Sequence, residues 1–233
     1  MAYHDAWQWQ REAAEAVRAG EDEALAVLQH PPIYTFGRRV CREHLLLDAA
    51  EIARRGATIV GSDRGGDVTF HGPGQLVAYP ILDLRRRNLA AADYVRMLED
   101  VMLKTAGAFG LEADRQLGHP GVWVDGAKLG AIGLRVQGGV STHGLALNVD
   151  PDLTWFDAIV PCGLSGVTVT SLAHLLRESP SIESVESALL AAFEGVFESD
   201  LAPTDAWSRF APLRERLADT PSEARPEVVA HGR

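Results

Sequence analysis

Cysteine and lysine are scarce in this chain. Of its 233 residues only two are cysteines, Cys41 and Cys162, and only two of its 22 lysine and arginine residues are lysines, Lys104 and Lys128. Two cysteines are too few for a secreted scaffold held by several disulfides. We therefore expect a reducing, cytoplasmic compartment.

Long apolar runs are also missing. No stretch of 18 apolar residues occurs, so we expect no membrane-spanning helix, and the polar residues after Met1 give no sign of a signal peptide. The formal net charge of −10 does not suggest a nucleic-acid partner. A hydrophobic content of 46% and a charged content of 23% are typical of a soluble globular domain.

The common nucleotide and metal motifs are absent. The chain has neither a G-x-G-x-x-G nor a G-x-x-x-x-G-K-[ST] pattern, which argues against a Rossmann or P-loop site. No C-x-x-C or H-x-x-x-H spacing supports zinc, although His71, His143, Asp67 and Cys162 could be imagined as ligands. We expect no ATP and no metal ion as cofactor.

Helical and strand patterns interleave irregularly along the chain. Helices are predicted over 7–18, 48–55, 91–109 and 184–197, and strands over 24–29, 33–36, 57–60, 67–71, 75–84, 121–124, 128–136 and 140–149. Asp125-Gly126 and Gly138-Gly139 predict tight turns between the last three strands. This order favours an α+β domain with mixed layers, in which helices flank a mixed, largely antiparallel sheet. We expect one domain over 1–218 and a frayed tail over 219–233.

The segment from Arg64 to Gln75 is the densest in polar chemistry. It reads Arg-Gly-Gly-Asp-Val-Thr-Phe-His-Gly-Pro-Gly-Gln, with Val68 and Phe70 alternating against Asp67, Thr69 and His71. Glycines on both sides allow another group to approach the backbone closely. The pattern predicts a strand beside a bound ligand.

Two residues could carry covalent chemistry. Cys162 stands between Pro161 and Gly163, on a stiffened turn that can present a thiol to a cleft, although most cysteines are small buried hydrophobes. Lys128 begins a predicted strand among small residues, where partial burial would lower its pKa and let it accept a thiol proton. A solvated hairpin lysine is the alternative. Cys41 has no comparable framing and is expected to be structural.

Five sequence blocks together resemble the lipoyl(octanoyl) transferases of the biotin/lipoate protein ligase-like superfamily. The blocks are His30 to Arg38, Arg64 to Gln75, Lys128 to Gly133, His143 to Val149 and Phe156 to Leu164, in the family's order and spacing. The resemblance covers about residues 24–200. It implies a fold like the biotin/lipoyl protein ligase catalytic domain.

The resemblance also implies a reaction. Octanoyl passes from the phosphopantetheine of acyl carrier protein to a lysine of a lipoyl domain, in 2-oxoacid dehydrogenase complexes or the glycine cleavage H protein. The family's pattern implies Cys162 as the nucleophile that forms a thioester, and Lys128 as the residue that activates it. It implies substrate binding by Arg64, Gly65, Gly66, Asp67, Val68, Thr69, Phe70, His71, Ala131, Ile132, Gly133, Gly144, Leu145 and Ala146.

The chemistry agrees with these residues. A free thiol has a pKa of about 8.5, so a neighbouring Lys128 could take its proton or stabilise the thiolate. Transfer from thioester to amide is downhill, so no ATP is needed. The apolar face of the motif strand, with Ala131 and Ile132, is expected to line a tunnel for the acyl chain. Phe70 departs from the tyrosine common in the family, so a hydroxyl there is not essential.

Two other functions compete with this interpretation. An ATP-dependent lipoate or biotin ligase of the same superfamily would need an adenylate site and could dispense with the cysteine. A catalytically silent module that only binds acyl groups or lipoyl domains would need neither Cys162 nor Lys128. Arginines near Arg38 and Arg85 are expected to form a basic rim for acidic partners, with no role for nucleic acid or membranes.

Overall fold

The computed structural model describes residues 1–160, 167–203 and 227–231. Its largest element is an eight-stranded sheet in the order β10-β11-β1-β5-β9-β8-β7-β6, in which every neighbouring pair is antiparallel. The strands are β1 (Ala24–Leu28), β5 (Gln75–Ile81), β6 (Asp114–Gln116), β7 (His119–Val124), β8 (Ala127–Gln137), β9 (Val140–Asn148), β10 (Leu201–Pro203) and β11 (Glu227–His231).

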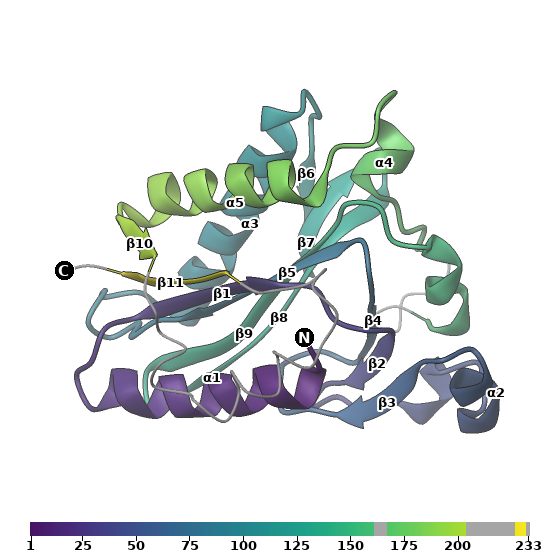
Figure 1. The fold of residues 1–233 in the computed structure, drawn as a ribbon, viewed down its shortest axis with the longest axis horizontal. Coiled ribbons are helices and arrows are strands. Elements are labelled where there is room, and N and C mark those ends of the chain that lie inside the picture. The colour runs from purple at the N-terminus through teal and green to yellow at the C-terminus, as the bar shows by residue number, and fades with distance from the viewer. Residues whose placement is uncertain (161–166, 204–226, 232–233) are drawn as a thin grey trace.

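Helices cover both faces of this sheet (Figure 1). On one face lie α3 (Ala91–Ala108) and α5 (Ile182–Phe197), which enclose the main core around Leu98, Leu147 and Phe193. On the other face lies α1 (Tyr3–Arg18), which buries Trp9 and its apolar neighbours against β1, β5 and β9. The single α+β domain that the sequence predicts is therefore confirmed.

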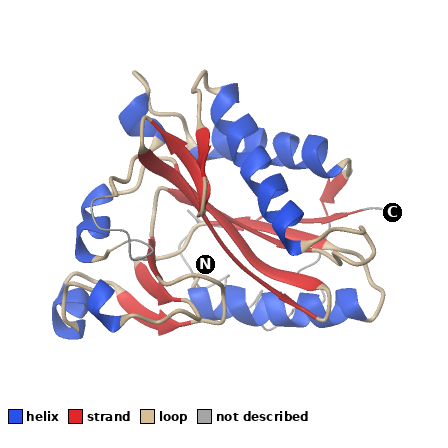
Figure 2. Ribbon diagram, turned by 180° about the vertical axis from the view of Figure 1, so that it is seen from behind, coloured by secondary structure: helices blue, strands red, loops and turns tan. Residues whose placement is uncertain are grey.

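A second sheet of three strands lies beside the N-terminal end of α1 (Figures 1 and 2). Its order is β3 (Thr58–Gly61), β2 (Ile33–Phe36) and β4 (Val68–His71), with β2 parallel to β3 and antiparallel to β4. The small sheet is therefore mixed, whereas the large sheet is entirely antiparallel. The short helices are η1 (Arg42–His44), α2 (Ala49–Arg54), η2 (Leu153–Ala158) and α4 (Leu172–Leu175).

Local chemistry explains the element boundaries. Asp48 caps α2, because its carboxylate accepts a hydrogen bond from the backbone N–H of Glu51. Asp125 and Gly126 both have positive φ, at 49° and 79°, which is the conformation that a two-residue hairpin turn requires. The long hairpin of β8 and β9 keeps one register from Gly130 opposite Leu147 to Gln137 opposite Val140.

Five residues of the segment 219–233, which is expected to be a frayed tail, form a strand. Glu227–His231 forms β11, which pairs with β1 on one side and β10 on the other. The β-branched residues Val228 and Val229 favour an extended backbone, and the free edge of β1 offers it hydrogen bonds. Within the described ranges, no helix is long and apolar enough to cross a membrane.

Candidate functional site

A pocket lies between the two sheets and the start of α1. Its walls come from three places: the glycine-rich motif, the facing strands β8 and β9, and residues of α1 and β5. The lining residues are Tyr3, Arg64, Gly66, Asp67, Val68, Thr69, His71, Val77, Tyr79, Ala131, Ile132, Gly133, His143, Gly144, Leu145 and Ala146.

The pocket brings together twelve of the fourteen residues that the resemblance implies as substrate-binding. The two outside it are Gly65 and Phe70. Ala131 stands directly opposite Ala146, and Gly133 opposite Gly144, across the β8–β9 pair. Small side chains at these positions leave the space that a larger residue would fill. The wall of β8 and β9 is therefore apolar and shallow.

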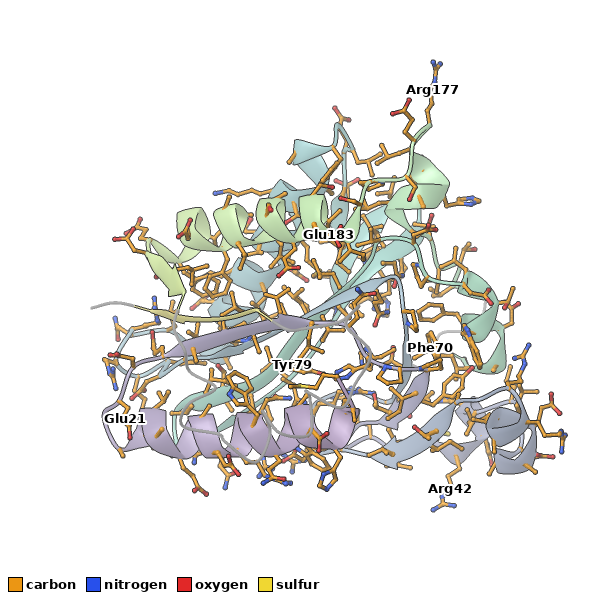
Figure 3. The ribbon with its side chains drawn as sticks, viewed as in Figure 1. Glu21, Arg42, Phe70, Tyr79, Arg177 and Glu183 are labelled. Carbon is orange, nitrogen blue, oxygen red and sulfur yellow. The ribbon has the colours of Figure 1, made fainter. Side chains whose placement is uncertain are left out.

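The predicted alternation of β4 is confirmed, but only part of its apolar face meets the pocket. Val68 packs in a separate core cluster and also lines the pocket, whereas Phe70 lies in that cluster and does not line the pocket. The Phe70 ring stacks on Trp155 at 5.2 Å between centroids and meets Phe156 edge-on at 5.6 Å. In Figure 3, Phe70 lies in this aromatic group, apart from Tyr79, which lies between the large sheet and α1. Thr69 and His71, on the polar face of β4, line the pocket together with Val68.

Arg64 holds the motif loop in shape. Its guanidinium group donates hydrogen bonds to the backbone carbonyls of Thr35, Gly65 and Asp67, and also to the Thr35 hydroxyl. A Cβ on Gly133 would come within 3.1 Å of the Arg64 side chain, so glycine there leaves room for it. Arg64 is thus a structural cation in the pocket wall.

The pocket ends in a cluster of buried histidines and tyrosines. His30 bonds to the Tyr79 hydroxyl at 2.8 Å, and the Tyr3 ring stacks near His71 at 6.3 Å. Burial lowers the pKa of His71 to about 4 and lowers the pKa of His30 well below its ordinary value. Both rings are therefore neutral near pH 7. A charged acyl tail would find no counter-ion in these two rings.

His143 is a pocket residue that the sequence interpretation does not include. Its Nε2 bonds to the Asp63 carboxylate at 2.7 Å, and burial lowers its pKa, so the neutral ring donates from Nε2. The Nδ1 atom is buried and has no hydrogen-bond partner among the described residues. His143 also has a positive φ of 58°, which is uncommon for a histidine. The signal in the sequence was the small-residue block around it.

Lys128 is buried at the start of β8, with 7% of its surface exposed. The alternative of a solvated hairpin lysine is therefore wrong. Its Nζ lies 5.0 Å from the centre of the Trp123 ring, a distance at which the ring face attracts a cation. A Cβ on Gly121 would come within 3.1 Å of the Lys128 Cε, so glycine there leaves space for the lysine side chain.

A chain of hydrogen bonds joins the pocket to the backbone of Lys128. His71 Nδ1 bonds to Gln75 Oε1 at 2.6 Å, Gln75 Nε2 donates to Asn148 Oδ1, and Asn148 Nδ2 donates to the Thr170 carbonyl. The backbone N–H of Thr170 in turn donates to the Lys128 carbonyl at 2.9 Å. The motif strand and the lysine are thus held in one polar framework.

Cys162 lies outside the described residues. The residues before and after its segment are held by described contacts. Val160 donates from its backbone N–H to the His44 carbonyl at 2.8 Å, and Lys128 donates from its own to the Thr168 carbonyl at 2.8 Å. Asp67 anchors the first contact, because its carboxylate pairs with His44 and accepts from the Cys41 N–H at 3.1 Å. The backbone of Cys41 is thus held by Asp67.

The two arginine groups do not form one rim. Arg86 donates to the carbonyl of Val17 at the C-terminal end of α1, and Arg87 pairs with Glu23. Arg42 lies in η1, near the small sheet and the opposite end of α1 (Figure 3). A 16-residue helix is about 24 Å long, so the groups are separated by at least the length of α1.

Among the described residues, no three His, Cys, Asp or Glu side chains gather in a way that could hold a metal ion.

Comparison with known proteins gives consistent results. The pattern of the lipoyl protein ligase A/B catalytic domain matches residues 2–194. An octanoyltransferase of Chloroflexus aurantiacus is 47% identical over 201 residues, which are 84% of this chain and 90% of that protein. An octanoyltransferase of Mycobacterium leprae is 43% identical over 206 residues, 86% of each chain.

Solved structures share the fold at lower identity. A lipoate-protein ligase A bound with ATP is 16% identical with a TM-score of 0.71, covering 91% of this chain and 90% of that one. A bipartite lipoate protein ligase of Thermoplasma acidophilum is 16% identical with a TM-score of 0.68, covering 91% and 88%. At this identity the likeness establishes the fold alone.

Proposed function

Because the chain belongs to the lipoyl protein ligase A/B catalytic domain family and is an acyltransferase, we propose that it transfers octanoyl from acyl carrier protein to a lysine of a lipoyl domain. The acyl group would pass through a thioester on Cys162. The acceptors would be the lipoyl domains of 2-oxoacid dehydrogenase complexes and the glycine cleavage H protein. The observation that carries the proposal is that one strand, β8, bears the buried Lys128 and the pocket residues Ala131 and Gly133.

The spacing on β8 suits an acyl thioester. Three residues along a strand span about 10 Å. The distance along β8 from Lys128 to the pocket wall at Ala131 is therefore similar to the length of a short acyl chain. The carbonyl end of the substrate would lie toward Lys128. The hydrocarbon would lie along Ala131, Ala146 and Leu145, where each buried methylene contributes about 0.8 kcal/mol.

The first half-reaction moves the acyl group to the enzyme. The Cys162 thiolate attacks the thioester carbonyl, a new carbon–sulfur bond forms, and the bond to the phosphopantetheine sulfur breaks. The departing phosphopantetheine thiolate takes up the proton that the Lys128 ammonium group gives up, which leaves Lys128 neutral for the second half-reaction. Lys128 would stabilise the Cys162 thiolate, and the Trp123 ring would favour the charged form of that lysine.

The second half-reaction moves the acyl group to the acceptor. The acceptor lysine amine attacks the Cys162 thioester, an amide bond forms, and Cys162 leaves as a thiolate. The proton lost by the attacking amine passes to Lys128. Arg64, Gly65, Gly66, Asp67, Val68, Thr69 and His71 would shape the pocket without reacting, whereas Phe70 would support the strand from its other face. No step needs ATP or a metal ion.

Transfer without ATP tests the proposal against the ligase alternative. The enzyme is mixed with a lipoyl domain and either octanoyl-acyl carrier protein alone or free octanoate with ATP and magnesium. We expect octanoylated lipoyl domain in the first mixture only. Product in the second mixture alone would identify an ATP-dependent ligase. Binding of the partners with no product in either mixture would identify a silent module.

A further inference from the structure

The segment from Arg38 to Leu46 carries exposed apolar and basic side chains together. Val40 and Leu46 are each 57% exposed, which makes them two of the few large hydrophobic residues that the described part of the chain leaves in solvent. Arg38, Arg39 and Arg42 are exposed beside them, and Arg42 points away from the fold in Figure 3. We call these five residues the 38–46 patch.

The charge of the 38–46 patch is opposite to that of the whole protein. Within the segment, three arginines stand against one acidic residue, Glu43, whereas the chain has a formal net charge of −10. An acidic partner would be repelled by most of this surface and attracted here. Local positive charge of this kind steers association and orientation more than it adds affinity.

The 38–46 patch is fixed directly to the pocket. The backbone N–H of Arg38 donates to the Arg64 carbonyl at 2.9 Å, and that of Arg39 donates to the Gly66 carbonyl at 3.0 Å. Arg64 and Gly66 both line the pocket. The far end of the segment is tied to the chain that precedes Cys162, because Leu46 donates to the Ala158 carbonyl at 2.8 Å. A partner seated here would stand at the site.

We propose that the 38–46 patch is the docking surface for the acyl donor, an acidic carrier protein whose acyl group hangs on phosphopantetheine. The inference rests on the proposed function. The chemistry selects the donor over the lipoyl-domain acceptor because only the donor brings a phosphodiester, and guanidinium groups bind phosphate oxygens in a forked geometry. Val40 and Leu46 would contact apolar side chains of the carrier protein.

Charge reversal tests the surface. The triple variant Arg38→Glu, Arg39→Glu, Arg42→Glu should fold, because the hydrogen bonds that fix Arg38 and Arg39 to the motif come from their backbone N–H groups. Circular dichroism and thermal unfolding check this. The control variant is Arg85→Glu, Arg86→Glu, which changes charge in the same direction at the opposite end of α1.

Acyl-enzyme formation is measured with two donors, octanoyl-acyl carrier protein and the small thioester octanoyl-N-acetylcysteamine, which lacks both carrier and phosphate. For the triple variant we expect KM for the carrier-bound donor to rise roughly ten-fold, with KM for the small thioester unchanged. The control variant should resemble wild type with both donors. A second variant, Val40→Ser, Leu46→Ser, should raise only the carrier-bound KM.

Three results would overturn the inference. They are an unchanged KM for the carrier-bound donor in the triple variant, an equal loss with both donors, and a loss confined to the lipoyl-domain step from preformed acyl-enzyme. The last result would show that the lipoyl-domain acceptor, and not the carrier protein, binds the 38–46 patch. Failure of the proposed function looks different, since wild-type enzyme would then form no acyl-enzyme from either donor.

Discussion

Replacing Ala131 by leucine should shorten the acyl chain that the enzyme prefers. Ala131 lines the pocket on β8 opposite Ala146, and leucine adds three carbon atoms to that wall. If these carbons displace two methylenes of the octanoyl chain, the lost burial is about 1.6 kcal/mol. That energy corresponds to a fall of about 15-fold in the rate of acyl-enzyme formation with octanoyl relative to the rate with hexanoyl.

Replacing Val77 by alanine should act in the opposite direction. Val77 lines the same pocket from β5, and its truncation removes two carbon atoms. Decanoyl should gain up to about 15-fold relative to octanoyl, less whatever space the surrounding core reclaims. The two variants together separate a change of pocket length from general damage.

The assay is single-turnover acyl-enzyme formation with acyl-acyl carrier proteins of four to ten carbons. Rates are taken from the intact mass of the enzyme, and the selectivity ratio between chain lengths is compared with that of wild type. An equal fall at every chain length in both variants would refute the reasoning, because the acyl chain would then not lie along β8 and β5.

Three further predictions follow from single contacts. Trp123→Leu should lower the rate of acyl-enzyme formation roughly ten-fold and raise the pH at which iodoacetamide alkylates Cys162. Trp123→Phe should stay close to wild type in both the rate and the alkylation pH. Equal alkylation profiles in all three proteins would refute a role for the ring. His71 is protonated below about pH 6.5 in the unfolded state but only near pH 4 in the folded state. The free energy of unfolding should therefore fall by about 3 kcal/mol as the pH drops through this window. Urea titrations in which His71→Gln keeps the full wild-type dependence of this free energy on pH would contradict the assignment. Asp67→Asn should lower the free energy of unfolding by about 1–2 kcal/mol, because it removes the charge that pairs with His44; a variant as stable as wild type would show that the pair contributes nothing.

Local patterns predicted most of the fold. The boundaries of β2 agree with the structure and those of β4 agree to within one residue, because each depends on neighbours within a few positions. The added strand β11 could not be foreseen from its own composition. Its pairing depends on the unfilled edge of β1, about 200 residues earlier in the chain.

Most of the residues that the resemblance implies for substrate binding line one pocket, but the orientation of β4 toward that pocket was not predictable. The alternation of β4 gave two faces, but which of its residues line the pocket depends on the aromatic cluster of Trp155 and Phe156, far along the chain. His143 and Tyr3 were missed because α1 and β9 bring them to the pocket only through tertiary packing. The arginines near Arg38 and Arg85 were grouped by composition, and the length of α1 separates them.

The acyl-enzyme itself tests the central claim most directly. Wild-type enzyme is mixed with octanoyl-acyl carrier protein without ATP, quenched in acid, and digested so that the modified peptide can be sequenced by mass spectrometry. The account predicts one octanoyl group on Cys162, lost on addition of a lipoyl domain, absent in Cys162→Ser and formed far more slowly near neutral pH in Lys128→Ala. An octanoyl group on another residue, an unmodified enzyme that still transfers, or an unchanged rate in Lys128→Ala would contradict it.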